Sequence, residues 1–181
     1  MGKGKKYITK ELIEILNQQK QRKEKGGLYH KCQVDFAYNS NKIEGSRLTE
    51  EQTEQIFDSN TIFINKDEEL VRLDDLTETL NHFRLFDKML DTLDQPLSEQ
   101  LLIDMNVILK RGTSYEDDIR YNVGGYKTQP NVVGVINVFH TSPPELVPKE
   151  MDKLLNDYLS KNSKLGKKTK YKSSSRPLCR I

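Results

Sequence analysis

The chain has 181 residues, of which 35% are hydrophobic and 31% charged, and its formal net charge is +2. These values are typical of a single globular domain with a modest core, and they exclude a disordered chain. No apolar run approaches the roughly 18 residues that a transmembrane helix needs, and no apolar segment follows the basic N-terminal residues, so we predict a cytoplasmic protein.

Two helices are predicted in the first quarter of the chain. Apolar residues recur at helical spacing after Thr9, and the glycine pair at 26–27 offers a stop, so the pattern predicts a half-buried first helix. Residues 34–45 predict a shorter second helix. It should end near Glu44, because Gly45 suits the left-handed conformation that ends many helices.

The next helix has a clear start signal. Thr49, followed three residues later by Gln52, matches a capping box, in which each side chain bonds to the backbone N–H of the other residue. Two acids in the first turn favour the positive end of the helix dipole. We therefore predict a third helix that runs to about Asp58.

Two longer amphipathic stretches follow. Leucines and a phenylalanine recur at threes, fours and sevens over about residues 69–90, which predicts the longest helix of the chain. Pro96 then interrupts the pattern, Ser98 can cap a new helix, and the apolar stripe continues to Lys110.

The pattern changes after residue 120. β-branched residues, glycines and a Pro130-Asn131 turn predict a short, exposed β-hairpin at about 123–139. An amphipathic helix is expected around Met151–Leu159. From residue 161 the chain is rich in lysine and serine, so we expect a disordered tail over 161–181. Eight basic and no acidic residues follow Asp157, which leaves a charge of −6 on the preceding part of the chain.

The second helix ends in Ser40, three further residues, Glu44 and Gly45. This segment resembles the inhibitory motif of the Fic protein family, which reads Ser or Thr, three residues, Glu, then Gly or Asn. Family members transfer AMP from ATP to a protein hydroxyl. The resemblance implies that Glu44 pairs with an arginine that otherwise holds the γ-phosphate of ATP, since a carboxylate and a triphosphate compete for one guanidinium. The alternative is that Glu44 is a solvated acid near a helix end.

The segment from Gly124 to Met151 also resembles the Fic family. It is similar to the family's flap hairpin, with the proline-rich turn and the helix that follow it. A flap of this kind offers backbone groups to which an extended target segment can add as a strand. The alternative is a purely structural hairpin. The residues that the resemblance assigns to target docking are Gly125, Tyr126, Lys127, Thr128, Val133 and Val135.

Together these features predict a mainly α protein, a Fic-type helical bundle with a small β-hairpin flap. The predicted organisation is an N-terminal helical extension over 1–33, a partial Fic domain over 34–160 and the basic tail over 161–181. Within the partial domain the inhibitory helix occupies 34–45 and the flap about 123–139.

The family's catalytic loop is missing from the sequence. That loop reads His-Pro-Phe-x-Asp/Glu-Gly-Asn-Gly-Arg, in which the histidine is the general base, the acid holds Mg²⁺ and the glycine-rich turn binds phosphates. None of His30, His82 and His140 begins such a sequence. We therefore predict no catalytic residue and no cofactor in this chain, although an intact family member requires ATP and Mg²⁺. The two cysteines lack further ligands at zinc-site spacing, so no metal site is predicted.

Three functions follow as alternatives. The favoured one is a Fic-family protein truncated before its active site by a frameshift or early stop, and therefore inactive in AMPylation. The second is a regulatory binding protein that lends its inhibitory helix to an intact Fic partner. The third, least favoured because the rest of the chain is acidic, is a nucleic-acid binder that uses the basic tail. The expected partner is a protein substrate or an intact Fic protein. No interaction with a membrane is expected.

Overall fold

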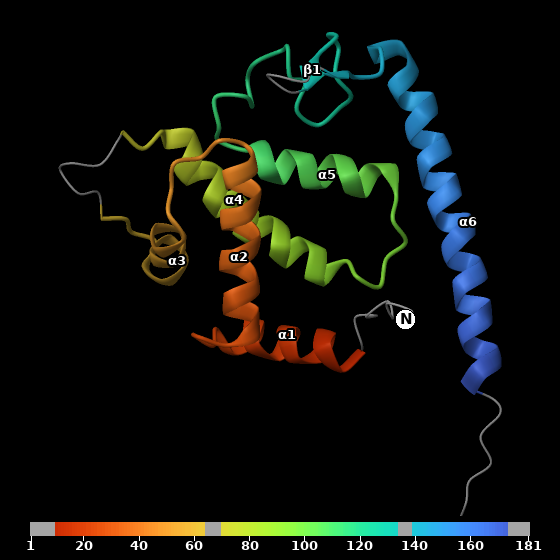
Figure 1. Ribbon diagram of the computed structural model, residues 1–181, viewed down its shortest axis with the longest axis horizontal. Coiled ribbons are helices and arrows are strands. Elements are labelled where there is room, and N and C mark those ends of the chain that lie inside the picture. The colour runs from red at the N-terminus through yellow and green to blue at the C-terminus, as the bar shows by residue number, and fades with distance from the viewer. Residues whose placement is uncertain (1–9, 64–69, 134–138, 174–181) are drawn as a thin grey trace, which may run out of the picture. The chain divides into compact units, whose positions relative to one another are not determined.

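The computed structural model describes residues 10–63, 70–133 and 139–173, with side chains up to residue 161 (Figure 1). The described residues form six α-helices, one 3-10 turn and one pair of short strands, and the predicted mainly α class is confirmed. The chain divides into two compact units. The first consists of Met1–Gln95 and Met105–Asp118, and the second of Pro96–Asp104 and Ile119–Ile181.

In the first unit, α1 spans Lys10–Arg22 and α2 spans Leu28–Ile43. The helix α2 begins before the predicted residue 34. Its first turns bury Tyr29 and His30, which are not aliphatic and were not part of the apolar pattern. The predicted left-handed residue at its end is confirmed, since Gly45 has a φ of +90°.

The helix α3 spans Glu50–Ser59 and has the predicted capping box. The Thr49 hydroxyl oxygen accepts a hydrogen bond from the Gln52 backbone N–H at 3.1 Å, and the Gln52 side-chain oxygen accepts one from the Thr49 N–H at 3.0 Å. Two N–H groups that would lack partners at a helix start are thus satisfied. Asn60, with a φ of 56°, ends the helix in the left-handed conformation.

The helix α4 spans Leu73–Asp91, and α5 spans Glu99–Lys110. The predicted cap of α5 is confirmed, because the Ser98 hydroxyl accepts a hydrogen bond from the Leu101 N–H at 3.2 Å. The core of the first unit lies between α2, α3 and α4, and a smaller cluster involves α1. The buried members of these two clusters are Ala37, Leu48, Ile56 and Phe83, and then Leu16, Tyr29 and Leu90.

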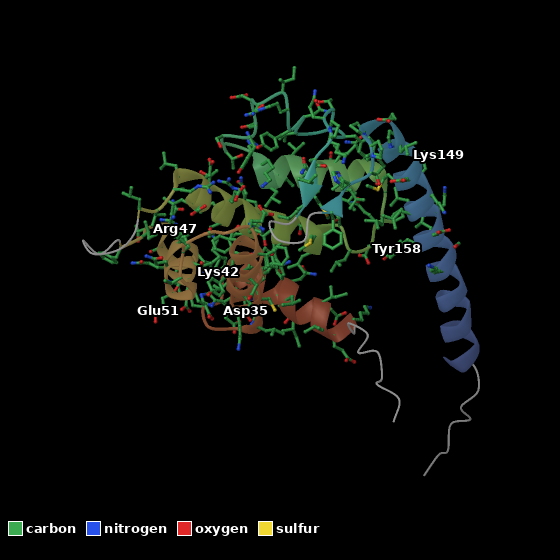
Figure 2. The ribbon with its side chains drawn as sticks, turned by 45° about the horizontal axis from the view of Figure 1, so that its top comes forward. Asp35, Lys42, Arg47, Glu51, Lys149 and Tyr158 are labelled. Atoms are coloured by element: carbon green, nitrogen blue, oxygen red, sulfur yellow. The ribbon has the colours of Figure 1, made fainter. Side chains whose placement is uncertain are left out.

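Polar side chains cover the outside of the same helices. Figure 2 shows Asp35 and Lys42 on α2, Arg47 in the segment after it and Glu51 on α3. Lys42, Arg47 and Glu51 are all exposed. The apolar stripe predicted over about residues 69–90 matches the burial of α4 only in part: Phe83 and Leu90 are buried, but Leu73 is 80% exposed.

The second unit contains the strand pair. Strand β1 (Val132–Val133) pairs antiparallel with β2 (Phe139–His140), so that Val132 lies opposite His140 and Val133 opposite Phe139. This pairing agrees with the predicted short hairpin. A 3-10 turn at Pro144–Leu146 leads into the last helix.

That helix, α6, spans Val147–Ser173 and corrects two predictions. It has 27 residues against 19 in α4, so α4 is not the longest helix. It also continues past residue 160, so the predicted disorder is wrong up to Ser173; residues 174–181 lie outside the described part. Lysine is a good helix former, and no proline occurs between Pro148 in the first turn and Pro177, so no proline forces the helix to stop at residue 160.

No helix in the described ranges has the length and apolar character needed to cross a bilayer.

Candidate functional site

The motif residues lie where α2 ends. Ser40 is half-buried in the last turn, and its carbonyl accepts the Glu44 N–H at 3.4 Å. The next two N–H groups turn back onto the helix: Gly45 to the carbonyl of Lys42 at 3.2 Å and Ser46 to that of Asn41 at 3.0 Å. These two bonds define a Schellman motif, whose left-handed position is occupied by Gly45. Glu44 is therefore presented at a fixed point, one residue before a sharp change of chain direction.

The Glu44 carboxylate is engaged by a cation from α5. Its Oε2 atom lies 3.2 Å from the Lys110 ammonium, which also donates to Glu78 Oε1 on α4 at 2.8 Å. The ammonium lies 4.9 Å from the centre of the Tyr115 ring, within the range of a cation–π contact. The three side chains differ in exposure: 48% for Glu44, 20% for Lys110 and 7% for Glu78. Glu44 is thus the solvent-facing member of a three-charge cluster.

The backbone around Lys110 is fixed by α4 and by the turn after α5. Asn81, which is fully buried, donates to the carbonyls of Leu109 at 2.9 Å and Arg111 at 2.7 Å. The Thr113 hydroxyl donates to the carbonyl of Lys110 at 2.7 Å. Carbonyls at a helix end have no partner within the helix, so these bonds stabilise the last turn of α5 and hold Lys110 in place.

The electrostatics favour a permanently charged Lys110. Burial alone would lower its pKa, but the hydrogen bond to Glu78 and the negative charge of Glu44 outweigh burial and raise the pKa above its usual value. One ammonium between two carboxylates leaves a formal charge of −1 on the cluster. Because Glu44 is the exposed carboxylate, a second cation would meet the cluster there.

Of the three histidines, His30 and His82 are buried, and His140 lies in β2. His82 is buried on α4; its Nδ1 atom bonds to the carbonyl of Glu78 at 2.8 Å, and burial lowers its pKa. His82 is therefore a core residue of α4. His30 is buried and bonds through Nε2 to Asp58 at 2.9 Å, while His140 belongs to β2. Within the described ranges, no group of three or more His, Cys, Asp and Glu side chains could hold a metal ion.

The proposed docking residues of the second unit are partly tied into its own structure. Gly125 closes a turn by donating to the Asn122 carbonyl at 3.0 Å. The Tyr126 hydroxyl donates to Glu99 at 2.7 Å, and burial together with that carboxylate raises the pKa of Tyr126 to about 12. Val133 lies in β1, opposite Phe139.

Lys127 joins the two arms of the hairpin. Its ammonium donates to the Asn131 side chain at 2.7 Å and to the Thr141 hydroxyl. The Thr141 hydroxyl in turn donates to the Asn131 carbonyl at 2.9 Å. Thr128 is exposed nearby, and Val135 lies outside the described residues. The contacts of Lys127 favour a structural role for this side chain within the hairpin.

Lys110 and Glu78 were not identified from the sequence. A lysine in the last turn of a helix is common because it complements the helix dipole. Lys110 is separated from Glu44 by 66 positions, and no local pattern connects them. Only the packing of α4 between the two chain segments brings the three charges together.

Comparison with known proteins identifies the fold. No protein-family model matches the chain, and no curated protein matches it significantly. Among solved structures, the chain is similar to a Fic domain-containing signalling protein from Bacteroides thetaiotaomicron, with a TM-score of 0.63 and 24% sequence identity. The chain has a Fic-type helical fold. The match covers 84% of this chain and 57% of the Bacteroides protein, so the chain spans less than two thirds of that protein's length.

Proposed function

We propose that these 181 residues carry the regulatory and target-docking parts of a Fic-type adenylyltransferase and do not transfer AMP by themselves. The Fic-type fold supports this framework. The observation that carries the proposal is the placement of Glu44. The motif glutamate stands at the Schellman end of α2, half-exposed, with one carboxylate oxygen on Lys110.

This geometry suits a carboxylate that competes with a phosphate group. Lys110 contacts Glu44 Oε2, so Oε1 can accept a guanidinium N–H without loss of that contact. The cluster's remaining negative charge attracts a guanidinium and repels a triphosphate. Glu44 therefore acts as a brake on any arginine that would otherwise hold the γ-phosphate of ATP.

The hairpin supplies the second part of the proposal. A two-stranded sheet has free backbone groups on its outer edges, to which an extended target segment can add. Val132 and Phe139, on the two paired strands, have exposed fractions of 53% and 68%. Their apolar surface is suited to side chains of such a segment.

A labelled-ATP assay tests the absence of transfer. The purified chain and its Glu44→Gly variant are incubated with Mg²⁺, labelled ATP and candidate target proteins. In an adenylyltransferase that contains the catalytic loop, loss of the inhibitory glutamate would release activity. Here we expect no label transfer from either form, because the sequence contains no general base followed by the phosphate-binding turn. Transfer by either form would overturn the proposal.

A second candidate function is inhibition of another Fic protein by this chain. The half-exposed Glu44 favours it, because a carboxylate that already has its own lysine can still accept an arginine from a partner. The assay uses a Fic adenylyltransferase whose own inhibitory glutamate is replaced by glycine. The wild-type chain should reduce its AMP transfer, and Glu44→Gln should not. The matched control is Glu51→Gln, an exposed acid on α3, which should inhibit like the wild type. Equal inhibition by all three forms would contradict a role for Glu44.

The cytoplasmic location and the nucleic-acid alternative stay predictions. The latter predicts a steep loss of binding between low and moderate salt that disappears when residues 161–181 are deleted.

A further inference from the structure

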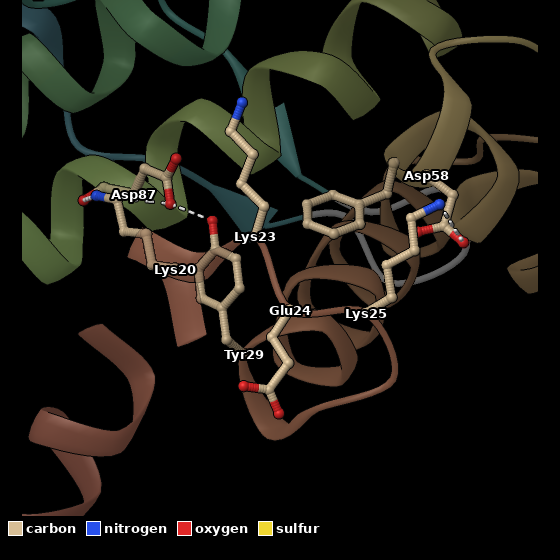
Figure 3. Close-up of a pocket in the computed structure, with 8 residues that line it drawn as sticks. Lys20, Lys23, Glu24, Lys25, Tyr29, Asp58 and Asp87 are labelled. Atoms are coloured by element: carbon tan, nitrogen blue, oxygen red, sulfur yellow. Dashed lines mark hydrogen bonds and ion pairs between the residues drawn. The ribbon is translucent and has the colours of Figure 1, made fainter. Parts of the chain in front are cut away.

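The first unit contains a cavity away from the motif cluster. It has a volume of about 410 Å³ and lies between α1, the turn after it, α2, α3 and α4 (Figure 3). Cavities of a few hundred Å³ are the size that holds small organic ligands. Neither the inhibitory motif nor the hairpin contributes a residue to its wall.

Two aromatic rings line this cavity, and one of them is rigidly held. The rings of Tyr29 and Phe57 meet edge to face, with centroids 6.2 Å apart at 60°. The Tyr29 hydroxyl donates to Asp87 at 2.6 Å (Figure 3). It also accepts a hydrogen bond from Gln33 at 2.9 Å. With its polar end occupied by protein groups, Tyr29 offers the cavity an apolar surface suited to another ring.

The two aspartates of the wall already have partners. Asp87 accepts hydrogen bonds from Tyr29 and Gln33, and Lys20 lies 3.7 Å from it. Asp58 is bonded to the ring of His30 at 2.9 Å. Their charges are thus partly neutralised before any ligand enters.

Lys23 is different. Within the described ranges it makes no side-chain hydrogen bond or ion pair, in contrast to Lys20, which pairs with Asp91 at 2.8 Å. In the view of Figure 3 its ammonium extends past the Tyr29 hydroxyl, while the neighbouring Glu24 carboxylate points the opposite way. The cation of the wall that is free to meet a ligand is therefore Lys23.

The backbone at Lys23 adds an independent argument. The N–H groups of Lys23 and Glu24 bond to the carbonyls of Lys20 and Gln19, both at 3.1 Å, which is the same Schellman pattern that ends α2. In α2 the left-handed position holds Gly45, whereas in α1 it holds Lys23 at a φ of 51°. A lysine is strained there and glycine is not. The chain thus has a lysine in the cavity wall at a position where glycine would be less strained.

We propose that this cavity binds a small aromatic anion, with its ring against Tyr29 and Phe57 and its anionic group on Lys23. Ring contact provides apolar burial, and the ammonium provides a charge-assisted hydrogen bond. An aromatic phosphate or carboxylate fits both requirements. This inference does not depend on the function proposed for Glu44.

The test is a titration of the isotope-labelled full chain with phenyl phosphate, followed by amide chemical shifts. We expect saturable shifts at Lys23, Tyr29 and Phe57. Inorganic phosphate, which lacks the ring, and benzyl alcohol, which lacks the anion, should each bind at least tenfold more weakly. No saturable shift with phenyl phosphate would overturn the proposal, as would equal affinity for inorganic phosphate.

Lys23→Gly is the decisive variant, because glycine removes the ammonium and suits the left-handed backbone, so the fold is kept. We expect at least a tenfold loss of affinity for phenyl phosphate. Lys42→Gln, which removes one exposed lysine at the other end of α2, is the matched control and should bind like the wild type. Equal binding by wild type and Lys23→Gly, or equal losses in the two variants, would contradict a site at Lys23.

Discussion

Replacing Lys110 with methionine tests how the charge cluster at the end of α2 is held together. The ammonium lies 2.8 Å from Glu78, which is 7% exposed, and 3.2 Å from Glu44, which is 48% exposed. Removing one partner of a buried ion pair costs about 3–5 kcal/mol, because the other charge stays in the interior. Since Lys110 is itself 20% exposed and methionine fills most of its volume, we expect K110M to lower the free energy of unfolding by about 3 kcal/mol.

Two further variants separate the buried contact from the exposed one. Glu44→Gln should cost only about 0.5 kcal/mol, because exposed ion pairs contribute little. The double variant K110M/E78Q should recover about 2 kcal/mol relative to K110M, since no buried charge is then left without a partner. Urea unfolding followed by circular dichroism measures each difference from the midpoint and slope. If K110M costs no more than Glu44→Gln, or if E78Q restores nothing, the buried pair does not anchor Lys110.

Substitutions at Gly45, Lys23 and Thr49 and a change of pH give further expectations, measured by the same urea unfolding. Gly45→Ala should lower the free energy of unfolding by about 1 kcal/mol, because alanine is strained at a φ of +90°. No atom lies within 4 Å of the added methyl group, so a steric clash does not contribute. An unchanged unfolding midpoint would argue against this strain. Lys23→Gly should instead stabilise the chain by about 0.5 kcal/mol, the relief of strain being partly offset by a freer unfolded chain; a loss of stability would show that the left-handed turn needs the lysine. Thr49→Ala should lower the free energy of unfolding by about 1 kcal/mol through loss of the cap of α3. Thr49→Ser should keep most of the stability, because serine can also cap the helix. Burial lowers the pKa of His82 in the folded state, so below about pH 6.5 the unfolded chain binds more protons and stability should fall with falling pH; this dependence should be weaker in His82→Gln.

Local rules predicted the ends of several helices from the sequence. The capping box at Thr49, the cap at Ser98 and the left-handed Gly45 each depend on residues within a few positions of one another, so they are visible in the sequence. The same rules failed at two places. The start of α2 has Gly27 as its N-cap with no side-chain hydrogen bond, and α6 continues through a lysine-rich segment that composition alone assigned to disorder.

The candidate site was predicted only in part, because only those of its features that lie within a few positions of one another are visible in the sequence. The motif around Glu44 is a contiguous sequence and could be identified by resemblance. Its partner Lys110 reaches it through tertiary packing: Asn81 of α4 fixes the end of α5, and Glu78 of the same helix takes part of the ammonium's charge. The left-handed conformation of Lys23 at the end of α1 could not be predicted from the sequence, because lysine is not the residue expected at such a position.

The central claim is that these residues supply a regulatory carboxylate and a docking hairpin without the groups that bind a nucleotide for transfer. Calorimetric titration of the purified chain with ATP in the presence of Mg²⁺ tests it most directly, with Glu44→Gly as a parallel sample. The account predicts no saturable, magnesium-dependent binding in either sample. Tight binding that requires Mg²⁺, in the wild type or after removal of the Glu44 carboxylate, would contradict it.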